Sequence, residues 1–340
     1  MKSTKLALII HHNDRDGYVS AAIIGQFLKD KNVTIDTMEV DYKSSLEDMI
    51  KENELKTEDF ETIFIVDYSI SNDKNKDFIL ALSKRCNLVW IDHHVSSIKY
   101  IEKYPELAEI DGYRIIGISG AGLSYIYTIK NKPLLPTENA IIETLEQKNN
   151  SFYKVQYVEA LDYLDEFECP ELIRMTHRYD IFDIDEDVLD FNYGCTIESY
   201  SEAYTLLTGK RTNSTAVMIR MVSDGRVIRN YVDKRNKEII KDYAQDILFY
   251  EKSVYDNKKK GMAVNHTMFN SLVFGSLIYD YDFVMVYANE KGIWRHSVYT
   301  IHDDMDCSKI AEYFGGGGHP KAAGFCLDSP FYNKKEFKII

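Results

Sequence analysis

The sequence of 340 residues lacks an excess of positive charge. It has 41 Lys and Arg residues against 54 Asp and Glu residues, which gives a formal net charge of −13. Proteins that hold long DNA or RNA by charge neutralise many phosphates with Lys and Arg, so the balance argues against a long duplex partner. Phosphate substrates are still possible, provided that something other than side-chain cations supplies the positive charge.

Long apolar runs and paired cysteines are also missing. No stretch of 18 apolar residues occurs, so no membrane partner is expected. The apolar segment near the N-terminus is short and lacks a small-residue cleavage site, which argues against a signal peptide. The five cysteines are widely spaced without a C-x-x-C pair, which argues against a disulfide framework or a zinc ribbon. A reducing cytoplasm is therefore the expected location.

Apolar runs alternate with helical patterns in the first hundred residues. Strands are predicted at 5–12, 33–40, 62–67 and 87–92, with helices at 18–30, 45–55 and 73–84. This alternation predicts βαβ units, a parallel sheet and an α/β fold. In such sheets ligands bind beyond the carboxyl ends of the strands.

The rest of the chain changes character twice. From about 120 to 260 the pattern is helical, and residues 207–260 could form one long helix or two. Segments 282–288 and 293–300, joined by a turn at 289–292, predict a β-hairpin, and a short helix near 308–314 follows. We therefore expect a parallel-sheet domain over 1–190, a helical linker over 191–260 and a smaller α/β domain over 261–335.

Acidic and histidine side chains stand at three predicted strand ends and in one helical segment. They are His11, His12, Asp14 and Asp16; Asp67; Asp92, His93 and His94; and His177 with Asp180. Carboxylates crowded at one sheet edge repel one another unless cations neutralise them. Carboxylates and imidazoles without cysteine suit Mn²⁺, Mg²⁺, Fe²⁺ or Zn²⁺. The set is large enough for two metal ions that share a carboxylate, an arrangement used in phosphoester hydrolysis.

Several of these residues also have structural interpretations. Asp16 precedes a helix and could be its N-cap, and Asp67 could simply begin a loop. Of His93 and His94, we expect one to bind a metal and the other to meet substrate or donate a proton, although one of them could be a buried, hydrogen-bonded histidine. Asp92 could fix the tautomer of an imidazole.

Four consecutive glycines, Gly315, Gly316, Gly317 and Gly318, precede His319. Packing or helix propensity does not account for such a run, because each glycine adds backbone entropy to the unfolded state. We expect the run to bring the main chain close to a ligand and to offer N–H groups to an anion, with His319 adding charge. A flexible linker is the alternative, and the apolar residues on both sides weaken it.

In this order the motifs resemble the DHH phosphoesterases that carry a C-terminal DHH-associated domain. They are D-x-D-G at 14–17, the strand-end Asp67, D-H-H at 92–94, the later Asp180, and G-G-G-G-H-x-x-A-x-G-F at 315–325. The segment before and through the glycine run is most similar to the branch that contains the bacterial nanoRNases, or oligoribonucleases. The resemblance implies a DHH catalytic domain over 1–190 and a substrate-binding domain over 261–335.

The resemblance also implies a role for each site residue. It assigns His12 and Asp14 to one metal ion, and Asp16, His93 and Asp180 to the second. Asp67 would bridge the two ions, Asp92 would orient a histidine and His94 would approach the scissile phosphate. Mn²⁺ is the expected metal, with Mg²⁺, Co²⁺ or Fe²⁺ as alternatives. The glycine run and His319 would hold the terminal phosphate or nucleotide of the substrate.

One position departs from the pattern of this branch. An Arg two residues after the Ser of the hairpin commonly contacts substrate phosphate there, and Tyr299 occupies that position. Arg295 or His296 could supply the missing charge, while Tyr299 could stack on a base or donate a hydrogen bond.

The expected function is a Mn²⁺-dependent phosphodiesterase that degrades short single-stranded RNA or DNA to 5′-nucleotides. Alternatives are a phosphodiesterase for cyclic mono- or dinucleotides or for a linear dinucleotide, and a phosphatase for nucleoside 3′,5′-bisphosphates. A binding module without catalysis is the alternative from another class, and it predicts the loss of metal ligands. A homodimer is left open.

Overall fold

The computed structural model describes residues 6–130, 136–150, 164, 167, 169–209, 214–267 and 270–340. The chain divides into two compact units, Met1–Val227 and Ile228–Ile340. The three-part division at residues 190 and 260 stays a prediction.

The first unit is built on a parallel sheet of four strands. They are β1 (Leu6–His12), β2 (Thr34–Val40), β3 (Thr62–Val66) and β4 (Asn87–Ile91). Their order is β2-β1-β3-β4, and every neighbouring pair is parallel. The predicted strands and the α/β fold are therefore confirmed. Since β1, β3 and β4 are neighbours, their carboxyl ends adjoin.

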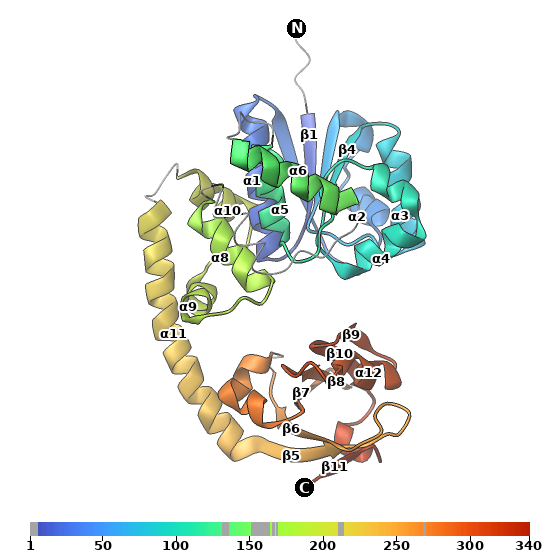
Figure 1. The fold of residues 1–340 in the computed structure, drawn as a ribbon, viewed down its shortest axis with the longest axis vertical. Helices are drawn as coiled ribbons and strands as arrows, with labels where there is room; N and C mark the ends of the chain where they lie inside the picture. The colour runs from blue at the N-terminus through green and yellow to red at the C-terminus, as the bar shows by residue number, and fades with distance from the viewer. Residues whose placement is uncertain are drawn as a thin grey trace. The chain divides into compact units, whose positions relative to one another are not determined.

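Helices cover both faces of this sheet (Figure 1). One core contains Ala7 and Ile9 of β1 together with residues of α1 (Arg15–Asp30), α5 (Gly120–Ile129) and α8 (Glu171–Asp180). The other contains Leu8 and Ile10 of β1 with residues of α2 (Leu46–Glu52), α3 (Asp73–Ser83) and α4 (Val95–Lys103). Burial on both faces explains why the strands are continuously apolar.

The middle of the chain is helical, as predicted, in the part that the structure describes. Its remaining elements are α6 (Pro136–Asn150), α9 (Glu186–Gly194), α10 (Tyr200–Thr208) and α11 (Ser214–Tyr243), with short 3-10 helices η1 (Thr57–Asp59) and η2 (Pro105–Glu109) earlier in the chain. Residues 210–213 and much of 151–168 lie outside the described residues.

The helical prediction for residues 207–260 is wrong in its last part. One helix of 30 residues, α11, ends at Tyr243, and strand β5 (Ala244–Phe249) follows directly. Ile247 and Phe249 are buried and alternate with less buried neighbours. This period of two fits a strand with one buried face.

The second unit contains a sheet of seven strands in the order β11-β5-β6-β7-β8-β10-β9. The further strands are β6 (Lys259–Asn265), β7 (Phe283–Glu290), β8 (Ile293–Tyr299), β9 (Gly317–His319), β10 (Ala322–Leu327) and β11 (Phe337–Ile339). Only the β6–β7 pair is parallel. Helix α12 (Cys307–Tyr313) and the 3-10 helices η3 (Ser271–Asp280) and η4 (Phe331–Asn333) complete the unit.

The predicted hairpin is present, but its turn is shorter than expected. Strands β7 and β8 extend to Glu290 and from Ile293, so that only Lys291 and Gly292 connect them. Both turn residues have positive φ, 52° and 95°. Two-residue turns of this kind match the twist of the flanking strands, which lets the pairing continue to the turn.

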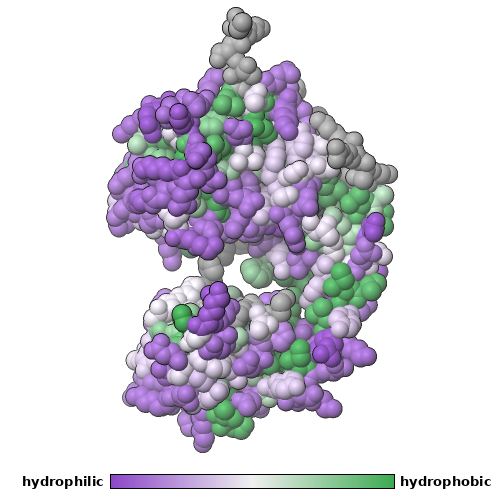
Figure 2. Space-filling view, turned by 180° about the vertical axis from the view of Figure 1, so that it is seen from behind, coloured by the Kyte–Doolittle hydropathy of each residue, from purple (hydrophilic) through white to green (hydrophobic). Residues whose placement is uncertain are grey.

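Hydrophilic residues cover most of the face seen in Figure 2. Among the described residues, no helix combines the length and apolar character that a bilayer crossing requires. All five cysteines are free.

Candidate metal centre

Carboxylate and imidazole groups gather where β1, β3, β4 and α8 end. Among the described residues, three groups have potential ligand atoms that all lie within 4.8 Å of one another. The groups are His12, Asp14 and Asp67; Asp16, His93 and Asp180; and Asp67, His93 and His94. The structure thus brings together all six residues predicted as metal ligands, and His94 lies beside them.

The structure distinguishes His12 from His11. His12 Nδ1 lies 2.8 Å from Asp14 Oδ2, within the first group. His11 is buried, and its Nδ1 lies 2.9 Å from the main-chain oxygen of His12. Successive side chains of a strand point to opposite faces, so only one of the pair joins the group. The geometry favours His12, as the motif spacing had indicated.

Asp14, and not Asp16, is the N-cap of α1. Its Oδ1 accepts a hydrogen bond of 2.9 Å from the Gly17 N–H. Burial raises the pKa of Asp14, but the hydrogen bonds from His12 and Gly17 outweigh this effect and lower it to about 2. A Cβ atom at Gly17 would lie 2.2 Å from the main-chain oxygen of His12, so this close approach of helix and strand requires glycine.

Asp16 points into the protein and meets the N-terminus of α5. Its carboxylate accepts hydrogen bonds from the N–H groups of Gly120, at 2.6 Å, and Ala121, at 3.0 Å. Burial and the charge of Asp180 nevertheless raise the pKa of Asp16 to about 7. This contribution of α5 was not predicted from the sequence. The only signal was the segment S-G-A-G at 119–122, which begins an apolar helix with an N-cap serine.

His177 supports the same helix end and is outside the three groups. It is fully buried, and its Nδ1 accepts a hydrogen bond of 3.1 Å from the Ser119 N–H. Burial lowers the pKa of His177 to about 3. A neutral His177 therefore holds the start of α5 in place.

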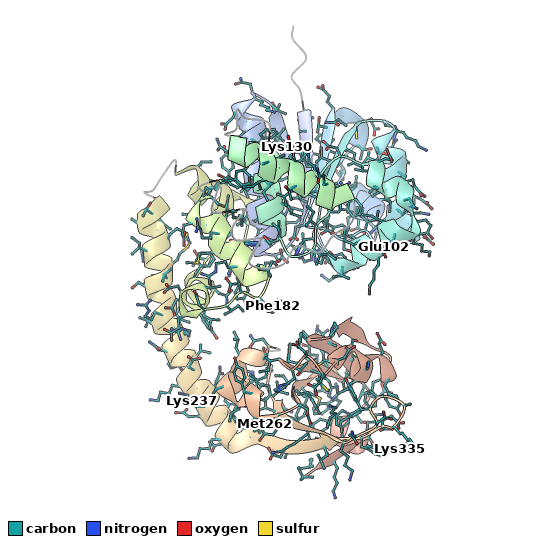
Figure 3. All side chains as sticks on the ribbon, in the orientation of Figure 1. Glu102, Lys130, Phe182, Lys237, Met262 and Lys335 are labelled. Carbon is teal, nitrogen blue, oxygen red and sulfur yellow. The ribbon has the colours of Figure 1, made fainter. Side chains whose placement is uncertain are left out.

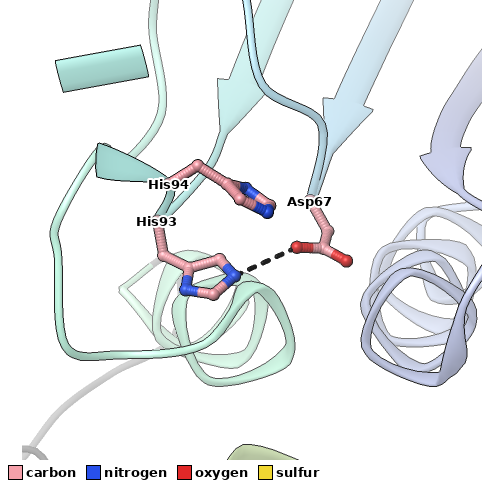
Figure 4. A group of neighbouring side chains, drawn as sticks. All are labelled: Asp67, His93 and His94. Atoms are coloured by element: carbon pink, nitrogen blue, oxygen red, sulfur yellow. Dashed lines mark ion pairs between the residues drawn. The ribbon is translucent and has the colours of Figure 1, made fainter. Parts of the chain in front are cut away.

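His93 lies among three carboxylates. Its Nε2 is 3.3 Å from Asp67 Oδ1, 3.4 Å from Asp180 Oδ2 and 3.9 Å from Asp16 Oδ2. Figure 4 shows the His93 ring facing Asp67, with His94 above it. Burial lowers the pKa of His93, but the charges of Asp180 and Asp16 outweigh it and raise the pKa above its usual range.

Asp67 occupies an unusual backbone conformation at the end of β3, with φ of +54°. Asp is one of the few residues that tolerates this left-handed region. Burial, followed by the charge of Asp16, raises the pKa of Asp67 well above its usual value. Burial also raises the pKa of Asp180.

Two carboxylate oxygens in this cluster are buried without a hydrogen-bond partner among the described residues, Asp67 Oδ1 and Asp180 Oδ2. Both oxygens face His93 Nε2, at 3.3 and 3.4 Å. A buried carboxylate oxygen that accepts no hydrogen bond is usually bound to a metal or paired with a charge. The donor set consists of oxygen and imidazole nitrogen atoms without sulfur, which suits hard and borderline divalent ions. The residues present therefore fit a metal centre.

Asp92 is fully buried and binds His94. Its Oδ1 lies 2.7 Å from His94 Nδ1, and the Ser97 hydroxyl donates to its other oxygen. Burial opposes ionisation of Asp92, but the neighbouring His94 lowers its pKa. Burial likewise lowers the pKa of His94, and Asp92 outweighs this to raise it to about 9. The hydrogen bond with Asp92 leaves Nε2 as the second nitrogen of the His94 ring. The roles of Asp92 in orienting His94 and of His94 at the phosphate stay predictions.

In the second unit, Arg295 and Tyr299 share one face of β8, and His296 lies on the other. Arg295 is exposed and forms an ion pair of 3.3 Å with Glu290. His296 is fully buried and stacks between Tyr287 and Phe325, at ring distances of 6.1 and 4.7 Å. The alternative in which His296 supplies charge to substrate is therefore wrong, because a strand period of two turns it into the core.

The glycine run has a partly structural explanation, contrary to expectation. A Cβ atom at Gly316 would lie 2.1 Å from the Gly324 oxygen, and one at Gly318 would lie 2.6 Å from the Ala323 Cα. The N–H groups of Gly315 and Gly316 donate to carbonyls of α12, so the expectation that the whole run offers N–H groups to an anion is wrong. Gly317 has open space around its Cα.

The pairing register still brings several predicted binding residues into one part of the sheet. His319 pairs with Ala322, which in turn pairs with Tyr299. The substrate-binding roles of Arg295, Tyr299, the glycine run and His319 stay predictions.

Comparison with known proteins gives a family match for part of the first unit. Residues 7–147 match the DHH family, N-terminal domain. This range extends from β1 into α6, so it contains the strand-end motifs and excludes Asp180. Over these residues the chain is similar to the DHH family, as its motifs indicated.

Other proteins are similar in sequence or in fold to most of the chain. It is 21% identical over 340 residues to oligoribonuclease NrnB of Bacillus subtilis (strain 168), covering 94% of this chain and 73% of that protein. A crystal structure of exonuclease RecJ bound to manganese matches with a TM-score of 0.51 and 15% identity, over 96% of this chain and 87% of that one. RecJ from Thermus thermophilus in complex with Mn²⁺ matches with a TM-score of 0.52 and 13% identity, over 96% of this chain and 50% of that one. At these identities the solved structures show a shared fold.

Proposed function

We propose that this chain is a phosphodiesterase that uses two divalent metal ions to hydrolyse short oligonucleotides to 5′-nucleotides. One observation carries the proposal: the Asp67 carboxylate lies within range of two sets of ligands. Asp67 belongs to the first ligand group, with His12 and Asp14. Its Oδ1 is also 3.3 Å from His93 Nε2. His93 belongs to the second ligand group, with Asp16 and Asp180. Two ions that share a bridging carboxylate need this arrangement.

His12 and Asp14 would hold one ion, Asp16, His93 and Asp180 the other, and Asp67 both. When bound, such ions supply Lewis acidity to the phosphate and activate water. We propose Mn²⁺ as the metal because it accepts both imidazole and carboxylate ligands, although Mg²⁺, Co²⁺ and Fe²⁺ suit related donor sets. The buried oxygens of Asp67 and Asp180 support this interpretation of the cluster, because they accept no hydrogen bond among the described residues.

His94 is proposed to act on the scissile phosphate. Because the pKa of His94 is raised to about 9 by Asp92, the imidazole is protonated at neutral pH. It can therefore donate a hydrogen bond to a phosphate oxygen and deliver a proton to the leaving oxygen. Asp92 and the Ser97 hydroxyl, both buried, hold the ring orientation.

The proposed substrate is short. The net charge of −13 disfavours long polyanions, while metal ions in the first unit would locally reverse the sign of the field. The similar protein from Bacillus subtilis is named an oligoribonuclease. In the second unit, we propose Arg295, Tyr299, Gly317, Gly318 and His319 as candidates for holding the end of the substrate. The free cysteines support a cytoplasmic location.

Turnover of bis-p-nitrophenyl phosphate by metal-stripped and Mn²⁺-loaded protein tests the enzyme class. A panel then tests the substrate: a dinucleotide, a longer single-stranded RNA, cyclic AMP, cyclic di-AMP, its linear form and adenosine 3′,5′-bisphosphate. We expect Mn²⁺-dependent turnover and the highest kcat/KM for the dinucleotides. Preference for a cyclic or bisphosphate substrate would overturn the proposed substrate, and no turnover of any phosphoester would overturn the enzyme.

A further inference from the structure

Phe182 is a large apolar side chain placed in solvent beside the metal centre. Its side chain is 81% exposed, and it follows Asp180 by two residues (Figure 3). Asp180 is the last residue of α8 and a member of the ligand group with Asp16 and His93. Two residues of chain keep the Phe182 backbone within about 7 Å of Asp180.

The backbone at Phe182 adopts a conformation that usually selects glycine. Its φ is +62°, in the left-handed region that crowds a side chain with a Cβ atom. The Phe182 N–H donates to Tyr179 O at 3.2 Å, and the Asp183 N–H donates to Arg178 O at 2.9 Å. This pair of hydrogen bonds is the Schellman motif that ends many helices, and glycine is the most common residue at the position of Phe182.

The segment that carries the ring is held in place by ion pairs. The Arg178 guanidinium binds the Asp183 carboxylate and lies 2.8 Å from Asp185 Oδ2. The Asp185 side chain also caps α9 through the Val188 N–H. The exposed ring is thus mounted on a backbone with fixed hydrogen bonds and is not part of a loose loop.

Phenylalanine at position 182 is unfavourable for the stability of the fold for two reasons. Phenylalanine is disfavoured at positive φ, and an exposed ring gains nothing from burial. Local departures of this kind concentrate at functional sites. The exposed Phe182 ring has no polar atom, so the main specific interaction open to it is stacking of its face on another flat, apolar ring.

We propose that Phe182 is a stacking residue for a nucleobase of the substrate, next to the phosphate that the metal centre holds. The inference rests on the proposed function. A nucleobase lies one sugar away from its phosphate, a spacing comparable with that between Phe182 and Asp180. Every base has a π-face, so a phenyl ring selects nucleotide substrates without selecting a base sequence.

The test compares Phe182→Gly, Phe182→Tyr and Phe182→Trp in the Mn²⁺-loaded full chain. The substrates are a dinucleotide and the same dinucleotide with one base removed at either position. Stacking contributes about 5- to 150-fold per base, so Phe182→Gly should raise the dinucleotide KM by this factor with little change in kcat. Tyr and Trp should retain the wild-type KM. On one of the two abasic analogues, wild type and Phe182→Gly should be equal.

Stability separates this role from a structural one. Phe182→Gly relieves the positive φ and should melt at or above the wild-type temperature while binding substrate more weakly. Tyr243→Ala, which removes a ring that is 67% exposed at the end of α11, is the matched control and should leave KM unchanged.

Three results would overturn the inference: an unchanged KM in Phe182→Gly, a lowered melting temperature in that variant, or a raised KM in Phe182→Tyr equal to that of Phe182→Gly. Failure of the proposed function would look different, since wild-type protein would then show no metal-dependent turnover of the intact dinucleotide.

Discussion

The crowding of carboxylates around Asp67 predicts that the metal-free protein is destabilised by its own site. The pKa of Asp16 is raised from 3.8 to about 7, which corresponds to about 4 kcal/mol of unfavourable interaction when it is ionised. The sign follows from linkage. A carboxyl group with a raised folded-state pKa stabilises the protein below the unfolded pKa, and this stabilisation is lost as the pH rises through the folded one.

Asp67→Asn removes a second carboxyl group whose pKa is raised well above its usual value, first by burial and then by the charge of Asp16. Asp67 is 1% exposed, and its Oδ1 has no hydrogen-bond partner among the described residues. The same linkage applies to Asp67, so the substitution should remove an unfavourable contribution of about 1–2 kcal/mol above pH 7. For a unit of this size the melting temperature in EDTA should then rise by about 2–8 °C.

Thermal melts with increasing Mn²⁺ provide the assay. At a metal concentration of about 100 times Kd, a site on wild-type protein contributes about 2.7 kcal/mol, a rise of about 5–10 °C. Asp67→Asn should show only a small rise, because both ligand sets lose their shared member. The order of the two melting temperatures is therefore expected to reverse: the variant melts at the higher temperature in EDTA, and wild type melts at the higher temperature in Mn²⁺.

Two results would refute this reasoning. A variant that melts below wild type in EDTA would show that the Asp67 carboxylate stabilises the metal-free fold. A wild-type response of the variant to Mn²⁺ would show that Asp67 binds no metal. Asp59→Asn, at an exposed carboxylate in η1, is the control and should follow wild type under both conditions.

Three further predictions concern other parts of the molecule. Asp92→Asn should lower kcat by about 100-fold or more, because His94 loses the charge that keeps it protonated. The Mn²⁺-induced rise in melting temperature should persist in this variant. Loss of that rise would place Asp92 among the metal ligands. His296 has its pKa lowered to about 4 by burial, so urea unfolding should show stability falling as the pH drops from about 6.5 toward 4. His296→Phe should remove this dependence, and an unchanged profile would contradict it. Gly17→Ala should cost about 1–3 kcal/mol in the same assay, because its methyl group would press on the His12 carbonyl; a cost near zero would show that helix and strand can separate.

The first unit could be predicted from local sequence because its signals are local. Each strand is a short apolar run, and each is followed by a helical pattern that implies a parallel neighbour. The site followed from the same reasoning, since Asp67 and the D-H-H segment stand directly at strand ends. Parallel strands that are neighbours in the sheet bring their carboxyl ends together, so the site needed little beyond the strand order.

Other features depend on contacts that a single segment does not reveal. The hydrogen bonds from Gly120 and Ala121 to Asp16 join residues more than a hundred positions apart. Strand β5 was expected as helix because its apolar pattern is short and follows a long charged helix. The packing of Gly316 against β10 depends on a strand pairing that the glycine run itself does not predict.

The special position of Phe182 could not be predicted from the sequence. In the sequence it is one aromatic residue among many, with 16 Phe, 2 Trp and 25 Tyr in the chain. Its exposure and its positive φ emerge only when the end of α8 is seen in three dimensions.

The rate of RNA hydrolysis as a function of length tests the central claim most directly. Mn²⁺-loaded protein is given a 5′-labelled dinucleotide, a pentanucleotide and a long single-stranded RNA, with metal-stripped protein as the blank. The account predicts metal-dependent release of 5′-nucleotides, with kcat/KM highest for the dinucleotide and pentanucleotide and lowest for the long RNA. Equal or faster cleavage of the long RNA, or equal rates without metal, would contradict it.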